Sequence, residues 1–116
     1  MEKKEEINQE AGGCPVTYAL SMIGGKWKLP ILRALSPNEV LRYNELKRRI
    51  VGITNMMLSQ SLKELEANGL ITRNQYPEIP PRVEYSLTQS GIDLRPTLAE
   101  LATWGTEQMK RTSERG

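Results

Sequence analysis

The stretch from residue 54 to residue 88 constrains the fold most, because a helical pattern there runs directly into two short strand patterns. Leu58, Leu62 and Leu65 recur at intervals of four and three residues, which places them on one face of a helix. The threonine before this pattern can cap the helix start with its hydroxyl, and the Asn-Gly pair after it is a typical stop signal. We therefore expect a helix over about residues 54–68, referred to below as the reading helix.

The face of the reading helix that lies opposite the leucines is small, polar or flexible and carries one positive charge. Its candidate DNA-contacting residues are Asn55, Met56, Ser59, Gln60 and Lys63. Helices that read the major groove of DNA present such faces, with their N-terminal residues nearest the base edges. The alternative is a surface helix whose outer face contacts only solvent.

Two strands joined by a stiff loop follow the reading helix. Residues 71–76 and 82–87 have strand composition, and the second segment alternates apolar and polar side chains as a half-buried strand does. Three prolines between the segments prevent the loop from continuing as strand or helix. Arg73 and Arg82 flank this loop, which suits insertion along a phosphate backbone or into a minor groove. The alternatives are a solvated arginine and a loop that protects a sheet edge.

The remaining periodic segments predict a mainly α chain in which this small β-hairpin is the wing. Helices are expected over residues 15–23, 26–35 and 43–50, with a last helix that begins at Pro96. The second helix is regular only from about Lys28, because Pro30 is compatible with a helix only in its first turn. The order of helix, turn, reading helix and wing indicates a winged helix-turn-helix.

Positive charge is concentrated around the reading helix and the wing. The net charge of the chain is only +2, but residues 26–82 hold ten basic and five acidic side chains. A basic segment of this kind attracts a polyanion. Lys47 and Arg49 lie just before the turn into the reading helix and are candidate phosphate contacts. A solvated charge is the alternative for any single basic residue, but it explains the concentration less well.

Length and composition limit the classes of protein to which this chain can belong. A chain of 116 residues with 38% apolar residues fits one domain, which we expect at residues 14–112 between a flexible arm (1–13) and a flexible tail (113–116). No apolar run of about 18 residues could span a membrane, and the polar N-terminus lacks the apolar segment of a signal peptide, so we expect a cytoplasmic protein. With one cysteine and no histidine, we expect no internal disulfide, no zinc site and no cofactor.

Several motifs taken together are specific for one family. They are Cys14-Pro15, GGKW at residues 24–27, Leu41-Arg42-Tyr43, LSQSLKELEANGLI at residues 58–71, YPEIPPRVEYSLTQSG at residues 76–91, and Trp104-Gly105. With these motifs, the chain resembles the HxlR-type branch of the MarR-like winged-helix transcription regulators over about residues 14–110. The resemblance implies a homodimer that binds a double-stranded DNA operator, and frequently a response to an oxidant or small electrophile through a cysteine near the N-terminus. Family members are usually basic at the positions of Met56 and Ser61, which are uncharged here.

The terminal helices carry more apolar side chains than a small winged core can cover. The residues expected at a dimer interface are Leu98, Leu101, Trp104 and Met109. Left exposed, they would form an adhesive patch on the surface. We therefore expect a protein that is dimeric through its first and last helices.

Cys14 is the only cysteine and precedes a proline, which places it at or next to the N-cap of the first helix. The helix dipole and the free N–H groups at such a position favour an anion and lower the pKa of a thiol. Together with the family resemblance, this makes Cys14 a candidate redox sensor. The alternative is an inert side chain, and any protein disulfide needs a thiol from a second molecule.

Three classes of function compete for this sequence. The reading helix, the wing and the charge pattern favour a dimeric, DNA-binding transcription regulator. The alternative is a winged-helix module that binds only protein, which would lack salt-dependent affinity for DNA. An enzyme is disfavoured, since the chain has no histidine, no Walker-type phosphate loop, no GxSxG motif and no cluster of metal ligands.

Overall fold

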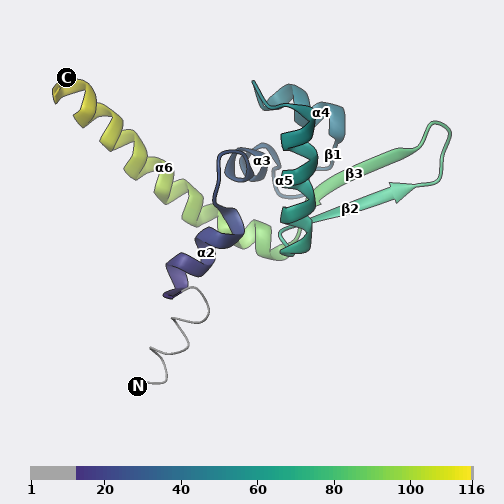
Figure 1. Ribbon diagram of the computed structural model, residues 1–116, viewed down its shortest axis with the longest axis horizontal. Coiled ribbons are helices and arrows are strands. Elements are labelled where there is room, and N and C mark those ends of the chain that lie inside the picture. The colour runs from purple at the N-terminus through teal and green to yellow at the C-terminus, as the bar shows by residue number, and fades with distance from the viewer. Residues whose placement is uncertain (1–12, 116) are drawn as a thin grey trace, which may run out of the picture.

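The computed structural model describes residues 13–115, which form five helices and three strands (Figure 1). In chain order these are α2 (Pro15–Ile23), α3 (Lys28–Ala34), β1 (Leu41–Arg42), α4 (Tyr43–Arg49), α5 (Asn55–Ala67), β2 (Ile71–Tyr76), β3 (Arg82–Leu87) and α6 (Gln89–Arg115). This arrangement confirms the predicted winged helix-turn-helix. All but the last residue of the arm predicted at residues 1–13 lies outside the described residues. No described helix is long and apolar enough to cross a membrane.

A three-stranded antiparallel sheet has the strand order β1-β3-β2, and β2 with β3 forms the predicted hairpin. The pairing runs from Ile71 opposite Leu87 to Tyr76 opposite Arg82, which confirms the boundaries predicted for both strands. The sequence pattern does not predict β1, because two residues are too short to show alternation. β1 pairs with β3 and so fastens the wing to the start of α4.

Helix α5 has the boundaries and the buried face that the leucine spacing predicts. The Thr54 hydroxyl accepts a backbone N–H of the first turn over 3.1 Å and caps the helix start. Leu58, Leu62 and Leu65 are at most 2% exposed. The helix ends before Gly69, whose φ of 76° favours a residue without a side chain. These local signals fix which face of α5 remains exposed.

The hydrophobic core lies where α3, α4 and α5 pack against each other and against the sheet. Its completely buried side chains are Ile31, Leu32, Leu35, Leu46, Leu58, Leu65 and Ile71. Helix α3 begins at Lys28, so that Pro30 falls in the first turn as expected. The completely buried side chains are therefore all leucine or isoleucine, and the chain has no phenylalanine.

The last helix differs from the prediction. Helix α6 begins at Gln89 rather than at Pro96. The Thr88 hydroxyl accepts the N–H of Gly91 over 3.2 Å and so caps the helix directly after β3. Pro96 then lies inside the helix, where its missing N–H removes one backbone hydrogen bond. The helix also continues to Arg115, through residues that the sequence assigns to a tail.

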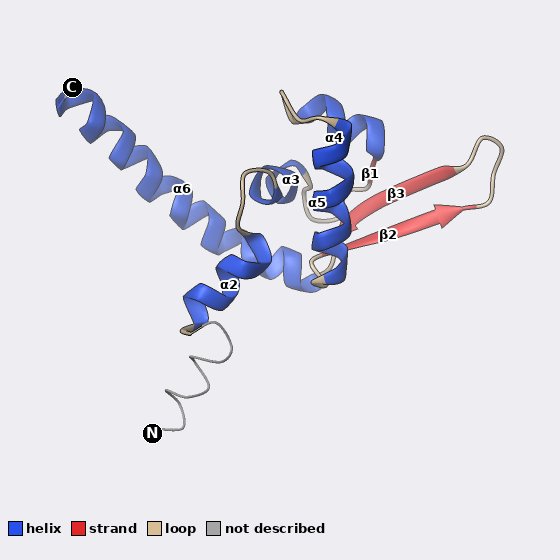
Figure 2. Cartoon of the chain, in the orientation of Figure 1, coloured by secondary structure: helices blue, strands red, loops and turns tan. Residues whose placement is uncertain are grey.

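Two features project from the packed centre of the molecule (Figure 2). The hairpin of β2 and β3 extends to one side, and α6 and α2 extend to the other. The radius of gyration is 17.0 Å, whereas a compact domain of this length has about 13 Å. The projecting elements therefore make the molecule more extended than a compact domain of its length.

Candidate nucleic-acid interface

The N-terminal end of α5 is held by a tyrosine from α4. The Tyr43 hydroxyl lies 3.1 Å from both the carbonyl oxygen and the side-chain Oδ1 of Asn55. It also lies 3.3 Å from the Oγ of Ser59. The structure therefore brings together two predicted base-contacting residues, Asn55 and Ser59. It adds Tyr43, whose only signal in the sequence is its place in one of the family motifs.

A groove of about 480 Å³ runs beside these residues, between α5 and the sheet. It is lined by the predicted cations Lys63 of α5 and Arg73 of β2, together with Tyr43 and Ser59. Glu66 also lines the groove, which leaves its walls with a net positive charge. Cations and hydroxyl groups are the side chains that most often contact the phosphate backbone of DNA. The groove therefore suits a nucleic-acid backbone.

Gln60 lies on the flank of α5 that faces α3, away from this groove. Its amide donates to the Glu64 carboxylate over 3.2 Å, and Glu64 is paired with the Lys28 ammonium over 2.9 Å. The Lys28 ammonium and then the Gln60 amide hold the pKa of Glu64 below its usual value. Met56 lies between the two flanks and is 71% exposed. The predicted reading face therefore has polar groups on both flanks of a central methionine.

Arg49, a predicted phosphate contact, is engaged within the chain. Its guanidinium donates to the Ala34 carbonyl over 3.0 Å and to the Glu39 carboxylate over 3.0 and 3.3 Å, which ties α4 to α3. The same guanidinium holds the pKa of Glu39 below its usual value. Lys47, by contrast, has no ion pair with another described residue. Arg49 therefore holds α4 against the end of α3, a role that the charge pattern alone does not predict.

Arg82, the other predicted backbone contact on the wing, is also engaged. It pairs with Glu78 over 3.1 Å and with Glu84 over 3.5 Å. Its guanidinium lies 4.1 Å from the centroid of the Tyr76 ring, a cation–π distance. Two carboxylates thus neutralise Arg82, which stiffens the hairpin. The tip beyond it presents Ile79, whose side chain is completely exposed.

Cys14 is the N-cap of α2, as the sequence predicts, and its side chain is exposed. Its Sγ lies 3.3 Å from the hydroxyl oxygen of Thr17 in the first turn. That hydroxyl, followed by backbone N–H groups of the same turn, holds the pKa of the Cys14 thiol below its usual value. The position therefore favours the thiolate, which is the form that reacts with oxidants and electrophiles.

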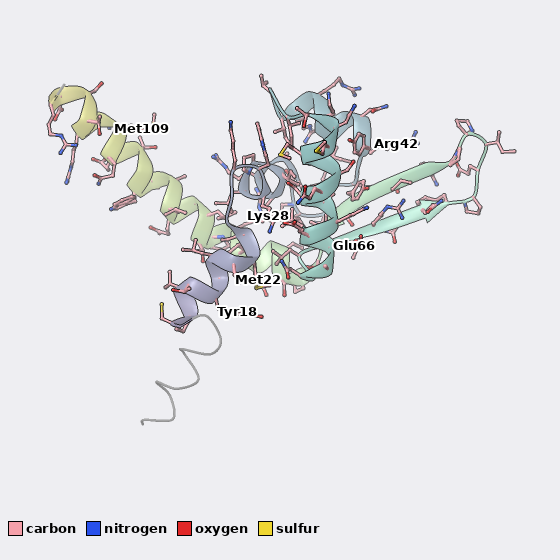
Figure 3. The ribbon with its side chains drawn as sticks, viewed as in Figure 1. Tyr18, Met22, Lys28, Arg42, Glu66 and Met109 are labelled. Atoms are coloured by element: carbon pink, nitrogen blue, oxygen red, sulfur yellow. The ribbon has the colours of Figure 1, made fainter. Side chains whose placement is uncertain are left out.

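Both terminal helices expose apolar side chains. Of the four residues predicted at a dimer interface, Leu98 is only 8% exposed and belongs to the core of its own chain, which corrects its assignment. The residues that are more than half exposed are Leu101, Trp104 and Met109 on α6, and Val16, Tyr18 and Leu20 on α2. Figure 3 labels Tyr18 and Met109, which lie on the projecting helices away from the sheet. The uncovered apolar surface thus involves α2 as well as α6.

Comparison of the sequence with known proteins places it among regulators. Residues 22–113 match the family described as HxlR-like helix-turn-helix. An uncharacterised HTH-type transcriptional regulator of Halalkalibacterium halodurans is 53% identical over 91 residues, which are 78% of this chain and 80% of that protein. The uncharacterised HTH-type transcriptional regulator YtcD of Bacillus subtilis is 44% identical over 112 residues, which are 96% of this chain and 82% of that protein.

Solved structures that are similar to this chain are also those of regulators. The redox regulator HypR in its reduced form is 38% identical and superimposes with a TM-score of 0.80, over 87% of this chain and 99% of HypR. The reduced form of the transcriptional regulator YodB from B. subtilis is 34% identical and superimposes with a TM-score of 0.69, over 78% of this chain and 89% of YodB. The similarity therefore covers most of the described residues.

Proposed function

Because this chain belongs to the HxlR-like helix-turn-helix family and is a DNA-binding transcriptional regulator, we propose that it binds an operator of pseudo-two-fold symmetry as a homodimer. The observation that carries the proposal is the exposed N-terminal half of α5 beside a groove lined by Lys63 and Arg73. Two such helices in a dimer would meet half-sites about 34 Å apart. The family and its relatives are transcriptional regulators rather than enzymes.

In this proposal, the exposed residues of α5 read the bases. Asn55 and Ser59 are near the helix start and combine donor and acceptor groups, which base edges in the major groove require. Gln60 adds an amide on the other flank, once it exchanges its bond to Glu64 for one to a base. Met56 offers only apolar contact, such as contact with a thymine methyl group.

The proposed phosphate contacts are Lys63 and Arg73 in the groove and Lys47 on α4. Lys63 and Arg73 are exposed, and neither has an ion pair with another described residue. Each is therefore available to replace a counterion of the DNA backbone. Arg49 and Arg82 support the site indirectly, since the first clamps α4 and the second stiffens the wing.

Selection of bound duplexes from a random pool tests this proposal. We expect an enriched sequence with two related half-sites, whose affinity falls steeply as salt rises. A scrambled duplex of the same length and composition is the control for non-specific binding. A folded protein that enriches no sequence and shows flat salt dependence would instead be a winged-helix module that binds only protein.

We also propose that Cys14 makes the regulator responsive to an oxidant or a small electrophile. The exposed thiol, the lowered pKa and the N-cap position support a reactive group. Similar structures include the redox regulator HypR in its oxidized form and diamide-treated YodB. Because Cys14 is the only cysteine, two Cys14 thiols from two chains would lose two protons and two electrons to the oxidant as their disulfide forms.

Operator affinity with and without diamide tests the redox response. Diamide would accept the two electrons and two protons and become the hydrazine, and the new crosslink would change how the two reading helices are spaced. We expect diamide to weaken operator binding by the wild type about five- to 150-fold, the usual range of coupling between two sites. The Cys14→Ser variant should bind equally well in both conditions. Equal loss in both proteins would place the response elsewhere in the molecule.

A further inference from the structure

We propose that Tyr43 is a positioning residue that fixes which groups Asn55 and Ser59 present to the bases of an operator. The inference rests on the proposed DNA contact through α5, and it goes beyond that contact because Tyr43 itself need not touch DNA. One hydroxyl from α4 is placed within 3.1 to 3.3 Å of two reading residues on α5. The hydroxyl therefore couples the two side chains that we expect to read neighbouring bases.

The direction of these hydrogen bonds follows from the chemistry of the three groups. The Tyr43 hydroxyl has one proton and can also accept a hydrogen bond. Both Asn55 oxygens near it are acceptors only, so the Tyr43 proton is directed to them. The Ser59 hydroxyl then donates its own proton to the Tyr43 oxygen. The result is one chain of hydrogen bonds that runs from Ser59 through Tyr43 to Asn55.

This chain of hydrogen bonds leaves different groups of Asn55 and Ser59 available to DNA. With its Oδ1 held by Tyr43, Asn55 directs its amide N–H groups away from Tyr43, where they act as donors. Because the O–H of Ser59 donates a hydrogen bond to Tyr43, the Ser59 oxygen is left to accept a hydrogen bond from DNA. We therefore expect Asn55 to select base edges that carry acceptors, such as O6 and N7 of guanine. Ser59 should select edges that carry a donor, such as N4 of cytosine.

Tyr43 can act in this way because its own position is fixed. Arg42 is the N-cap of α4, and its backbone N–H donates to the Glu45 carboxylate over 2.8 Å, which closes the first turn. The Tyr43 ring is partly buried and packs against the core. The hydroxyl therefore reaches α5 from a rigid support, so that its loss should affect the reading residues rather than the fold.

Tyr43→Phe tests the inference, because it keeps the ring and removes only the hydroxyl. Bound sequences are selected from a random pool by the wild type and by the variant. We expect discrimination at the bases read by Asn55 and Ser59 to fall about three- to tenfold, the usual contribution of one hydrogen bond. The salt dependence should remain that of the wild type, and the thermal midpoint should fall only by the few degrees that one hydrogen bond contributes. Thr103→Val removes an exposed hydroxyl from the face of α6 opposite its exposed apolar side chains and is the control, which should select the wild-type operator.

A second series separates positioning from a general structural effect. In a protein that already carries Asn55→Ala and Ser59→Ala, the Tyr43→Phe change should reduce discrimination no further. Unchanged discrimination by Tyr43→Phe in the wild-type background would overturn the inference. An equal loss for all sequences with a lower thermal midpoint would overturn it too, because Tyr43 would then be only structural. If the wild type itself selects no sequence, the proposed function fails, and this inference fails with it.

Discussion

The core region (α3, α4, α5 and the sheet) buries most of its large apolar side chains, whereas the terminal region (α2 and α6) buries Ile23 and Leu98 but leaves most of the others at least partly exposed. In the core region, Ile31, Leu46 and Leu65 are completely buried. In the terminal region, Val16 is 66% exposed and Trp104 is 63% exposed. One chain therefore completes the first region, whereas the second keeps a surface whose contact with water is unfavourable. This difference supports the proposal that a second copy of the chain covers α2 and α6.

The cations of the core region show a similar division. Lys28, Arg49 and Arg82 each pair with a carboxylate of their own chain. Lys63 and Arg73, which line the groove beside α5, have no such partner among the described residues. The molecule thus leaves two surfaces of different chemistry uncovered, an apolar one on the terminal helices and a cationic one beside α5. The first fits another copy of the chain, and the second fits a polyanion.

Charge placed on the apolar face of α6 should have the largest effect on function. We expect Trp104→Glu combined with Met109→Glu to give a monomer, because two buried carboxylates without partners would oppose association. Operator affinity should then fall about 100- to 10,000-fold, the advantage gained by engaging two linked half-sites. Sedimentation velocity and operator titration measure the two effects.

Thr103→Glu is the matched control for this pair, because Thr103 is exposed on the opposite face of α6. It should sediment and bind as the wild type does. A Trp104→Glu, Met109→Glu protein that remains a well-folded dimer would show that the exposed face of α6 is not the dimer interface.

Leu65→Ala and Leu101→Ala compare the two regions by stability. Leu65 is completely buried, so its truncation should lower the free energy of unfolding by about 2–5 kcal/mol at every protein concentration. Leu101 is 51% exposed in one chain. Its truncation should cost less than about 1 kcal/mol in dilute protein, and more as concentration rises and the partner covers it. Urea unfolding at several protein concentrations measures both, and a Leu101→Ala cost that is independent of concentration would contradict a partner contact there.

The sequence predicts best where local signals agree with the tertiary structure. The leucine spacing of α5, its Thr54 cap and the glycine at its end act within one helix, so its boundaries can be predicted. The start of α6 cannot be predicted in the same way. Pro96 is a typical first residue of a helix, but Thr88 at the end of β3 already caps one.

Some residues of the candidate site can likewise be predicted from local sequence patterns, and others cannot. Residue type and periodicity identify Asn55, Ser59 and Lys63, because exposure on α5 follows from helical spacing. The partners of Arg49 come from the end of α3 and the loop after it, and those of Arg82 from within the wing, and charge counting does not show them. The role of Tyr43 depends on the angle between two helices, which no local pattern specifies.

Lys63→Ala and Arg82→Ala test whether a cation without an ion pair among the described residues contributes more to the salt dependence of DNA binding than a paired one. Removing Lys63 should lower the slope of log affinity against log salt by about 0.9, the value for one phosphate contact. Arg82→Ala should weaken binding to all sequences alike but change the slope less, because Glu78 and Glu84 already neutralise its charge. Titrations of operator and scrambled duplex at four salt concentrations give both slopes. A larger change of slope for Arg82→Ala than for Lys63→Ala would show that the wing arginine leaves its carboxylates and binds phosphate.

The smallest effect is expected at Cys14, at the start of the terminal region. The Thr17 hydroxyl favours the thiolate and lowers the pKa of Cys14. Thr17→Val keeps the shape but removes this hydrogen bond, so the pKa should rise and less thiolate should be present at pH 7. Alkylation by iodoacetamide at pH 7 should then be slower than in the wild type, and the difference should vanish at high pH, where both thiols are fully ionised. Thr103→Val, on α6, should leave the pH dependence unchanged. Identical pH profiles for Thr17→Val and the wild type would remove Thr17 from the chemistry of this thiol, and would leave the N-terminal backbone groups of α2 as the only support for its reactivity.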